Sequence, residues 1–323
     1  MGIVRPEILR GPAELGARRI ALEFLAKVCE TRDRLDDPSD ADALHDFRVA
    51  LRRLRSWLRA FRPQLRDTLR SKVEQRLARI ADVTGTSRDL EVHIAWVKRA
   101  RRQMPDRARP GAEWLLRRLR RLKKNADAEL REVIDRDFAK ATRRTELALE
   151  CYMARVADDG PRFGETASAL VAREAAALQS AILQVTGQGD RAEAHAGRIA
   201  TKRLRYALDG LASVGVEVNS IPDELKNLQD TLGELHDAQQ FGSDLATMIA
   251  TVVADRQQDA RKTGRGRRRR AAEGDPVAGL RMMLKQLRRT EAKAFREFQE
   301  SWKTGDPSQR FIARLAAIER SLR

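Results

Sequence analysis

The chain has 323 residues and a mass of 36.5 kDa, more than one typical domain of about 100–200 residues, and its hydrophobic content of 42% excludes wholesale disorder. It carries 64 lysine and arginine residues against 47 aspartate and glutamate residues, a net charge of +17 that favours polyanionic partners. Two cysteines, Cys29 and Cys151, exclude a disulfide framework and a zinc site of thiolates alone, and they are typical of a reducing compartment.

The spacing of apolar residues predicts an almost entirely helical, all-α chain. Apolar residues recur every three or four positions, and the alternation typical of strands is missing. The predicted helices are Leu15–Leu35, Leu44–Phe61, Leu65–Val83, Trp114–Ile134, Ala167–Leu183 and Val277–Trp302. Asp190 and Glu193 have the spacing of a capping box, which predicts a helix start at that point. The sequence Asp-Asp-Gly-Pro at 158–161 is typical of a linker and divides the chain into 1–160 and 161–323.

Two segments that lie 150 residues apart have closely similar sequences. His45–Arg55 reads HDFRVALRRLR and His195–Arg205 reads HAGRIATKRLR, with six identical residues among 11. A second pair of similar segments follows in each half, at an offset of 148, and matches Leu77 with Leu225, Asp82 with Asp230, Gly85 with Gly233, and Asp89 with Asp237. Self-similarity at a fixed spacing is typical of repeated structural units. We therefore infer a duplicated helical unit, with one basic helix in each half.

The basic residues of these helices form two stripes. At 100° per residue, the cations of the first helix fall between roughly 260° and 340°, beside apolar residues between roughly 160° and 240°. The first basic stripe comprises His45, Arg48, Arg52, Arg55, Arg59 and Arg62, and the second comprises His195, Arg198, Lys202 and Arg205. From Arg48 through Arg62 no acidic residue stands three or four positions after a cation, so the cations repel one another. A solvated face is the alternative, but repelling charges in both halves favour an anion site.

The sequence gives little support to metal binding or catalysis. The four histidines, His45, His93, His195 and His236, show no H-x-x-x-H or H-E-x-x-H spacing, so we expect no metal site and no cofactor. There is no Gly-Lys dipeptide of a P-loop, and no E-x-E-x-K pattern. Asp89 and Asp237 follow Arg88 and His236, and we expect them to orient these neighbours or to cap a helix. The chain is therefore predicted not to be an enzyme.

Two further tracts are rich in arginine and lysine. One lies on the helix after Trp114 and comprises Arg117, Arg118, Arg120, Arg121, Lys123 and Lys124. The other, residues 264–270, reads as a flexible basic loop. Both tracts fit auxiliary contacts to a polyanion and fit solvated surface equally well. The longest apolar run, Leu245–Ala254, is about half of the roughly 20 residues that a spanning helix needs, so we expect no membrane insertion.

The repeated segments resemble the CHAD family, the conserved histidine α-helical domain. HDFRVALRRLRSWLRAF and HAGRIATKRLRYAL are similar to its two signature helices, and LARIADVTGTSRDLEV and LKNLQDTLGELHDAQQF to the segments that follow them. The resemblance extends over about residues 12–323. It implies two four-helix-bundle-like halves, related by an internal pseudo-twofold duplication, around a central basic cavity. It also implies binding of inorganic polyphosphate.

Residue by residue, the resemblance carries a polyphosphate-binding role onto the two stripes. The matching positions are His45, Arg48, Arg52, Arg55 and Arg59 in the first half, and His195, Arg198, Lys202, Arg205, Lys226 and His236 in the second. Arg53 and Arg203, which are identical in the two segments, and Arg88, which matches His236, complete the candidate site. Two departures, Asp209 opposite Arg59 and Ala78 opposite Lys226, make the two faces unequal.

The leading hypothesis is a non-catalytic protein that binds inorganic polyphosphate in the cytoplasm, on polyphosphate or polyhydroxyalkanoate granules. The chain has only nine Phe, four Trp and two Tyr residues, and single-stranded nucleic acid is usually held by aromatic stacking. One alternative is a metal-dependent phosphohydrolase of polyphosphate or triphosphate. Another is a non-specific nucleic-acid binder that uses the arginine-rich tracts.

Overall fold

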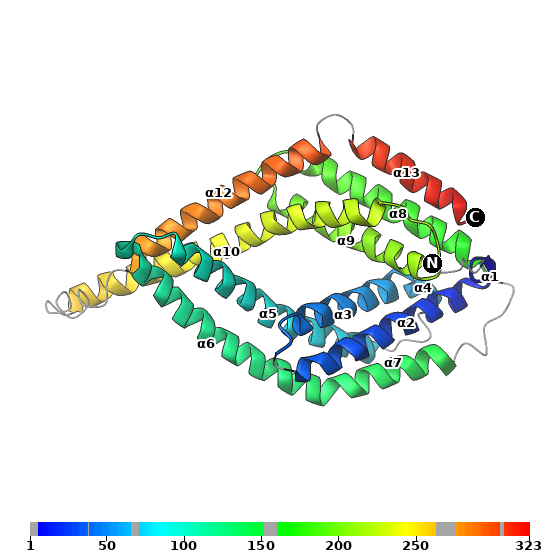
Figure 1. The fold of residues 1–323 in the computed structure, drawn as a ribbon, viewed down its shortest axis with the longest axis horizontal. Helices are drawn as coiled ribbons and strands as arrows, with labels where there is room; N and C mark the ends of the chain where they lie inside the picture. The colour runs from blue at the N-terminus through cyan, green and yellow to red at the C-terminus, as the bar shows by residue number, and fades with distance from the viewer. Residues whose placement is uncertain (1–5, 38, 66–70, 152–159, 263–275, 304–306) are drawn as a thin grey trace. The chain divides into compact units, whose positions relative to one another are not determined.

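A computed structural model of the chain describes residues 6–37, 39–65, 71–151, 160–262, 276–303 and 307–323. These residues form helices and no strand, apart from an isolated β-bridge between Pro12 and Arg162, so the predicted all-α class is confirmed (Figure 1). In chain order the elements are α1 (Pro6–Arg10), α2 (Ala13–Asp33), η1 (Arg34–Asp36), α3 (Ala43–Ala60), α4 (Arg62–Leu65), α5 (Ser71–Arg102), η2 (Asp106–Ala108), α6 (Arg109–Val133), the π-helix η3 (Ile134–Phe138), α7 (Ala139–Cys151), α8 (Phe163–Gln184), α9 (Arg191–Ser213), α10 (Ile221–Lys262), α12 (Pro276–Trp302) and α13 (Pro307–Ser321).

The main differences from the predicted helices are in length. The helix expected to end at Val83 is part of α5 and continues through Gly85 to Arg102. Likewise, α10 runs through Gly233 and has 42 residues. A single glycine inside a helix costs only about 1 kcal/mol relative to alanine, so the packing of the apolar residues on both sides keeps the helix continuous.

The capping box predicted at Asp190 is wrong, although α9 does begin at the next residue. The Asp190 side chain makes no capping hydrogen bond to α9. Its Oδ2 atom instead accepts hydrogen bonds from the backbone and hydroxyl of Thr186, at 2.8 and 2.7 Å, and from the Gly187 backbone at 2.8 Å. These bonds close the preceding turn and hold the pKa of the Asp190 carboxyl below its ordinary value.

The chain divides into two compact units, each made of segments that are separate in the sequence. The division into helical repeats at 1–160 and 161–323 stays a prediction. Unit 1 contains residues 1–85, 129–230 and 299–323, and unit 2 contains residues 86–128 and 231–298. Each unit therefore takes helices from both halves of the sequence, and α5 and α10 contribute to both units. The duplication inferred from the sequence stays a prediction.

Trp57 on α3 is a central residue in the core of unit 1. In this unit α2 packs on α3 and α8 packs on α9 (Figure 1). Trp57 is 1% exposed, lies 4.4 Å from the Phe61 ring and 5.9 Å from the Phe24 ring, and donates a hydrogen bond of 2.8 Å to the Ala17 carbonyl. A Cβ atom at Gly210 on α9 would overlap the indole ring. Glycine at this position therefore lets α9 approach α3 closely.

A buried arginine connects α2 to the end of α7 in unit 1. Arg18 is fully buried and forms an ion pair with Glu14 one turn earlier on α2. Its Nη1 atom donates hydrogen bonds to the carbonyls of Ala148, at 3.1 Å, and Leu149, at 3.4 Å. Carbonyls in the last turn of a helix lack partners within the helix, so this contact fixes the end of α7.

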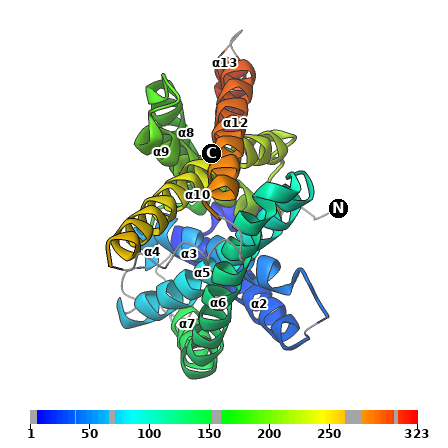
Figure 2. The ribbon, with the colours of Figure 1, turned by 90° about the vertical axis from the view of Figure 1, so that its left-hand side faces the viewer.

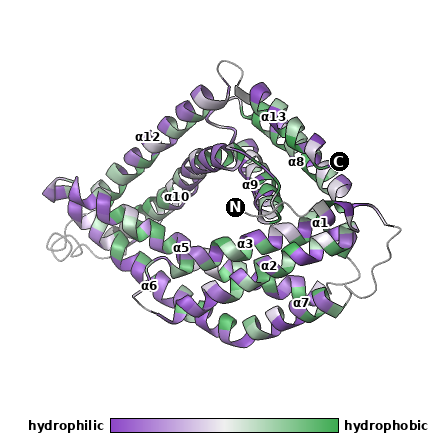
Figure 3. Ribbon diagram, turned by 45° about the vertical axis from the view of Figure 1, so that its right-hand side comes forward, coloured by the Kyte–Doolittle hydropathy of each residue, from purple (hydrophilic) through white to green (hydrophobic). Residues whose placement is uncertain are grey.

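Unit 2 has a separate core made by α5, α6, α10 and α12. The ring of Phe241 on α10 stacks on His93 at 4.0 Å and meets Trp96 edge-on at 5.5 Å. Around them lie buried aliphatic residues such as Leu115, Leu245 and Leu280. Hydrophobic and hydrophilic residues alternate around the helices, as expected for amphipathic helices packed on a core (Figure 3). Among the described residues, no helix is both long and apolar enough to cross a membrane.

Candidate functional site

The two basic stripes lie on α3 and α9, which contact each other within unit 1. On α3 the residues Phe47, Leu51 and Leu54 are completely buried, and they fix which face of the helix points to the core. The cations Arg48, Arg52 and Arg55 fall beside this face and are half-buried, as are Arg198, Lys202 and Arg205 on α9. The helical period that buries the apolar residues thus brings two rows of cations toward the α3–α9 contact.

Arg52 is the point at which the two stripes meet. Besides Arg48 on its own helix, Arg198 and Arg205 on α9 are close enough to lower its pKa. The main cause of this lowering is burial, and Tyr206 acts in the opposite direction. Arg52 forms no ion pair with any acidic residue that the structure describes. The guanidinium is always charged in proteins, so the nearby like charges destabilise the Arg52 cation, and a bound anion would offset them.

Three polar atoms at this meeting point are buried and have no hydrogen-bond partner among the described residues. They are Nε of Arg52, Nε of Arg205 and the hydroxyl oxygen of Tyr206. Tyr206 is 1% exposed, and the Arg205 guanidinium lies over its ring, 4.9 Å from the centroid. Leaving a buried polar group unpaired costs about 1–3 kcal/mol. A ligand rich in acceptor oxygens would remove that cost.

Along α3, the first stripe continues from Arg52 to two further cations. Burial is the main cause that lowers the pKa of Arg55, Asp82 on α5 raises it, and Arg59 lowers it again. Arg59 itself is exposed. Asp82, a residue of the second repeated segment, therefore lies close enough to Arg55 to favour its charged form.

The two stripe histidines begin the rows of cations, and both are exposed. For His195 partial desolvation is the largest cause that lowers the pKa, and Arg198 and Lys202 lower it further. Each of these causes disfavours the imidazolium. Negative charge added nearby would act in the opposite direction and favour the imidazolium form of His195.

Arg53, the residue that falls outside the first stripe, links α3 to α9. Its Nε atom lies 3.0 Å from Oδ2 of Asp209, in an ion pair whose angles do not make it a hydrogen bond. Asp209 is the acidic departure noted in the second stripe, so the structure explains why an acid stands there. Arg203 and Lys226 are exposed. A part for these three cations in binding stays a prediction.

The remaining candidates, Arg88 and His236, belong to unit 2. Arg88 forms an ion pair with Glu91 at 2.8 Å. Asp89 and Asp237 lie inside α5 and α10, so the expectation that they cap a helix is wrong. Sequence reasoning also missed Tyr206 as part of the Arg52 cluster. Its position next to Arg205 in the sequence was visible, but its proximity to Arg52 depends on how α3 and α9 pack.

Metal coordination finds no support in the described parts of the chain. No three side chains of His, Cys, Asp or Glu are grouped there so that they could hold an ion. The basic loop predicted at 264–270, which includes Arg268, lies outside the described residues, as do the first two residues of the predicted linker at 158–161.

Comparisons with known proteins show the family and the fold of this chain. Residues 19–246 match the model of the CHAD domain. The fold is similar to the crystal structure of the CHAD domain from the plant Ricinus communis, with 17% identity, 95% of this chain and 93% of that chain covered, and a TM-score of 0.62. It is also similar to PptA from Streptomyces chartreusis, with 15% identity, 91% and 100% covered, and a TM-score of 0.69. The search of curated proteins found no match. The family match covers more than half of the sequence, and this chain belongs to the CHAD domain family.

Proposed function

We propose that the protein binds inorganic polyphosphate, without catalysis, at the α3–α9 contact. The observation that carries this proposal is the cluster of Arg52, Arg198 and Arg205, with two guanidinium Nε atoms and one hydroxyl buried and unpaired. Phosphate oxygens accept bidentate hydrogen bonds from guanidinium groups, so a chain of phosphates would satisfy both the charge and the donors. Membership of the CHAD family is consistent with this ligand.

The aromatic residues of α3 and α9 favour polyphosphate over nucleic acid. Phe47 is 0% exposed, and Trp57 and Tyr206 are 1% exposed each, so their rings are not available to stack on bases. Base stacking contributes about 1–3 kcal/mol per base to the binding of single strands. A polymer made only of phosphates has no bases to stack, so the absence of exposed aromatic rings does not lower its affinity.

The test compares long-chain polyphosphate with duplex DNA of equal total charge, titrated into the full chain at about 0.15 M salt. We expect polyphosphate to bind at least ten times more tightly, with an affinity that falls as salt rises because counterions are released. Equal or weaker affinity for polyphosphate would contradict the proposal. Release of phosphate from the chain in Mg²⁺ or Mn²⁺, lost in His45→Gln or His195→Gln, would instead support the alternative of a phosphohydrolase.

Polyphosphate affinity should rise as pH falls from 8 through neutral. In the free protein Arg198 and Lys202 help to hold the pKa of His195 down, and a bound polyanion would offset them. The complex then binds a proton that the free protein does not. Affinity therefore increases as pH falls through the pKa of the complex, by roughly two- to tenfold, and levels off below the pKa of the free protein.

Titration calorimetry at pH 8, 7 and 5.5 would measure this change, with His195→Gln as the matched variant. The variant should lose part of the pH dependence and keep most of the affinity at pH 8. An identical pH dependence in the two proteins would show that His195 does not take up the proton.

We further propose that binding places the protein on polyphosphate or polyhydroxyalkanoate granules in the cytoplasm. A basic surface that holds a polymer at many points would stay attached to a polyphosphate granule. A fluorescently tagged chain should move into granules when cells accumulate polyphosphate, and the change should be reversed in cells starved of phosphate.

A further inference from the structure

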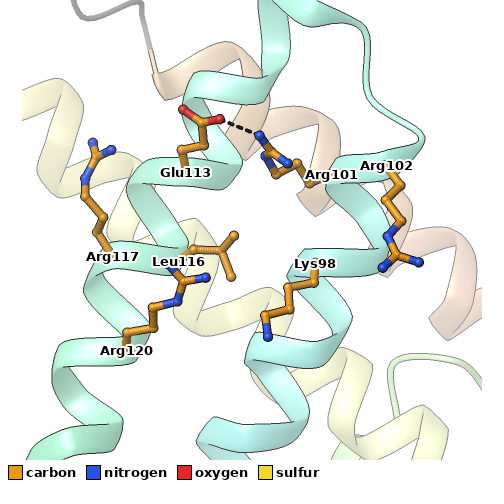
Figure 4. Close-up of a pocket in the computed structure, with 7 residues that line it drawn as sticks. All are labelled: Lys98, Arg101, Arg102, Glu113, Leu116, Arg117 and Arg120. Atoms are coloured by element: carbon orange, nitrogen blue, oxygen red, sulfur yellow. Dashed lines mark hydrogen bonds and ion pairs between the residues drawn. The ribbon is translucent and has the colours of Figure 1, made fainter.

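Unit 2 contains a pocket that shares no residue with the two stripes. Its volume is about 450 Å³, in the range usual for sites that hold small molecules. The pocket lies between α5 and α6, which run side by side in this unit (Figures 1 and 2). Seven residues line it: Lys98, Arg101, Arg102, Glu113, Leu116, Arg117 and Arg120 (Figure 4).

The helical period places these side chains around the pocket. On α5, residues 98, 101 and 102 have the spacing of one helix face, and on α6 residues 113, 116, 117 and 120 do the same. Between them Leu116 is 6% exposed and belongs to the core of unit 2, as do Val97, Ala100 and Leu119 on the adjoining turns. The buried residues of α5 and α6 hold the two helices in place, and this packing fixes the positions of the cations on them.

The charges around the pocket are unbalanced. Arg101 pairs with the single carboxylate of the lining, Glu113, at 2.8 Å (Figure 4). Within the ranges that the structure describes, the other four cations, Lys98, Arg102, Arg117 and Arg120, form no ion pair. In Figure 4 Lys98 and Arg120 extend from opposite helices along the two sides of the pocket. Facing cations without counter-charges favour a bound anion with more than one negative charge.

We propose that this pocket is a second anion site, which binds a compact compound of several linked phosphates between Lys98 and Arg120. Tripolyphosphate is the simplest such compound. The guanidinium of Arg120 can hold a pair of phosphate oxygens, and the ammonium of Lys98 adds a point charge. The described lining includes no aromatic ring on which a base could stack, which disfavours single-stranded nucleic acid.

The decisive experiment measures binding of tripolyphosphate to the full chain by titration calorimetry. The background is Arg52→Glu/Arg205→Glu, so that the α3–α9 site does not contribute. Lys98→Glu/Arg120→Glu is then added, and the control adds Arg288→Glu/Arg289→Glu, which makes the same change of charge at two exposed residues of α12 in the same unit. Thermal unfolding of each variant checks that unit 2 remains folded.

We expect the pocket variant to weaken tripolyphosphate binding at least tenfold, and the control to weaken it less than threefold. Equal losses in the pocket variant and the control, or no loss in either, would overturn the proposal. A fall in duplex DNA affinity as large as that for tripolyphosphate would also overturn it, since the surface would then serve nucleic acid. The Lys98→Gln/Arg120→Gln variant repeats the test if the glutamate variant unfolds.

A further experiment tells whether the pocket binds a segment of long-chain polyphosphate or a free short compound. If Lys98→Glu/Arg120→Glu, made in the otherwise unchanged protein, also weakens long-chain polyphosphate, the pocket binds part of that chain. If only tripolyphosphate binding falls, the pocket binds free short phosphates, and both results support the site. A different result would contradict the proposed function: long-chain polyphosphate would still bind normally to the Arg52→Glu/Arg205→Glu protein.

Discussion

Replacing Arg52 and Arg205 with glutamate should nearly abolish binding of long-chain polyphosphate. These two residues supply the buried, unpaired Nε atoms at the place where the stripes meet. The exchange removes two guanidinium groups and places two carboxylates where phosphates would lie, so repulsion replaces attraction. We expect affinity to fall on the order of a hundredfold or more, which corresponds to about 2.7 kcal/mol.

A glutamate at position 52 would lie near Arg48 and Arg198, so the fold should tolerate it better than most buried charges. The matched control is Arg288→Glu/Arg289→Glu, which has the same net charge and should lose less than threefold. Arg52→Gln/Arg205→Gln separates lost donors from added repulsion and should fall between the two. If the glutamate variant and the control lose the same affinity, only net charge matters and the α3–α9 site is not used.

Trp57→Ala should cause the largest loss of stability of any single core substitution in α3. The indole is 1% exposed, packs on Phe24 and Phe61, and donates a hydrogen bond to the Ala17 carbonyl. Truncating a buried tryptophan or phenylalanine to alanine typically costs about 3–5 kcal/mol. The measurement is the free energy of unfolding in denaturant, followed by circular dichroism.

Gly210→Val tests the same contact from α9, because its side chain would have to displace the indole ring. Overpacking of this kind typically costs about 1–3 kcal/mol. Leu183→Ala on α8 is the control, since Leu183 is 62% exposed and should change stability by less than about 0.5 kcal/mol. A Trp57→Ala protein as stable as this control would show that the indole does not hold α3 and α9 together.

The helices and their basic faces could be predicted because both depend on residues close together in the sequence. The apolar spacing around Phe47, Leu51 and Leu54 located α3 within one residue at its start and its end, and the same period set Arg48, Arg52 and Arg55 on one face. The helix ends were less predictable. Asp190 has the right spacing for a cap, but its side chain found better partners in the preceding turn.

The all-α class and the two rows of cations follow from local spacing, and the resemblance to the CHAD family follows from the repeated segments. That Arg52 lies near Arg198 and Arg205, that Arg53 pairs with Asp209, and that Tyr206 is buried near them depends on how the helices pack. It also brought Lys98 and Arg120 to one pocket. The physical reason is that a helical period fixes the direction of a side chain around its own axis, whereas the approach of two helices depends on shape. At the α3–α9 contact that shape is set by a missing side chain at Gly210 and a large one at Trp57, which are far apart in the sequence.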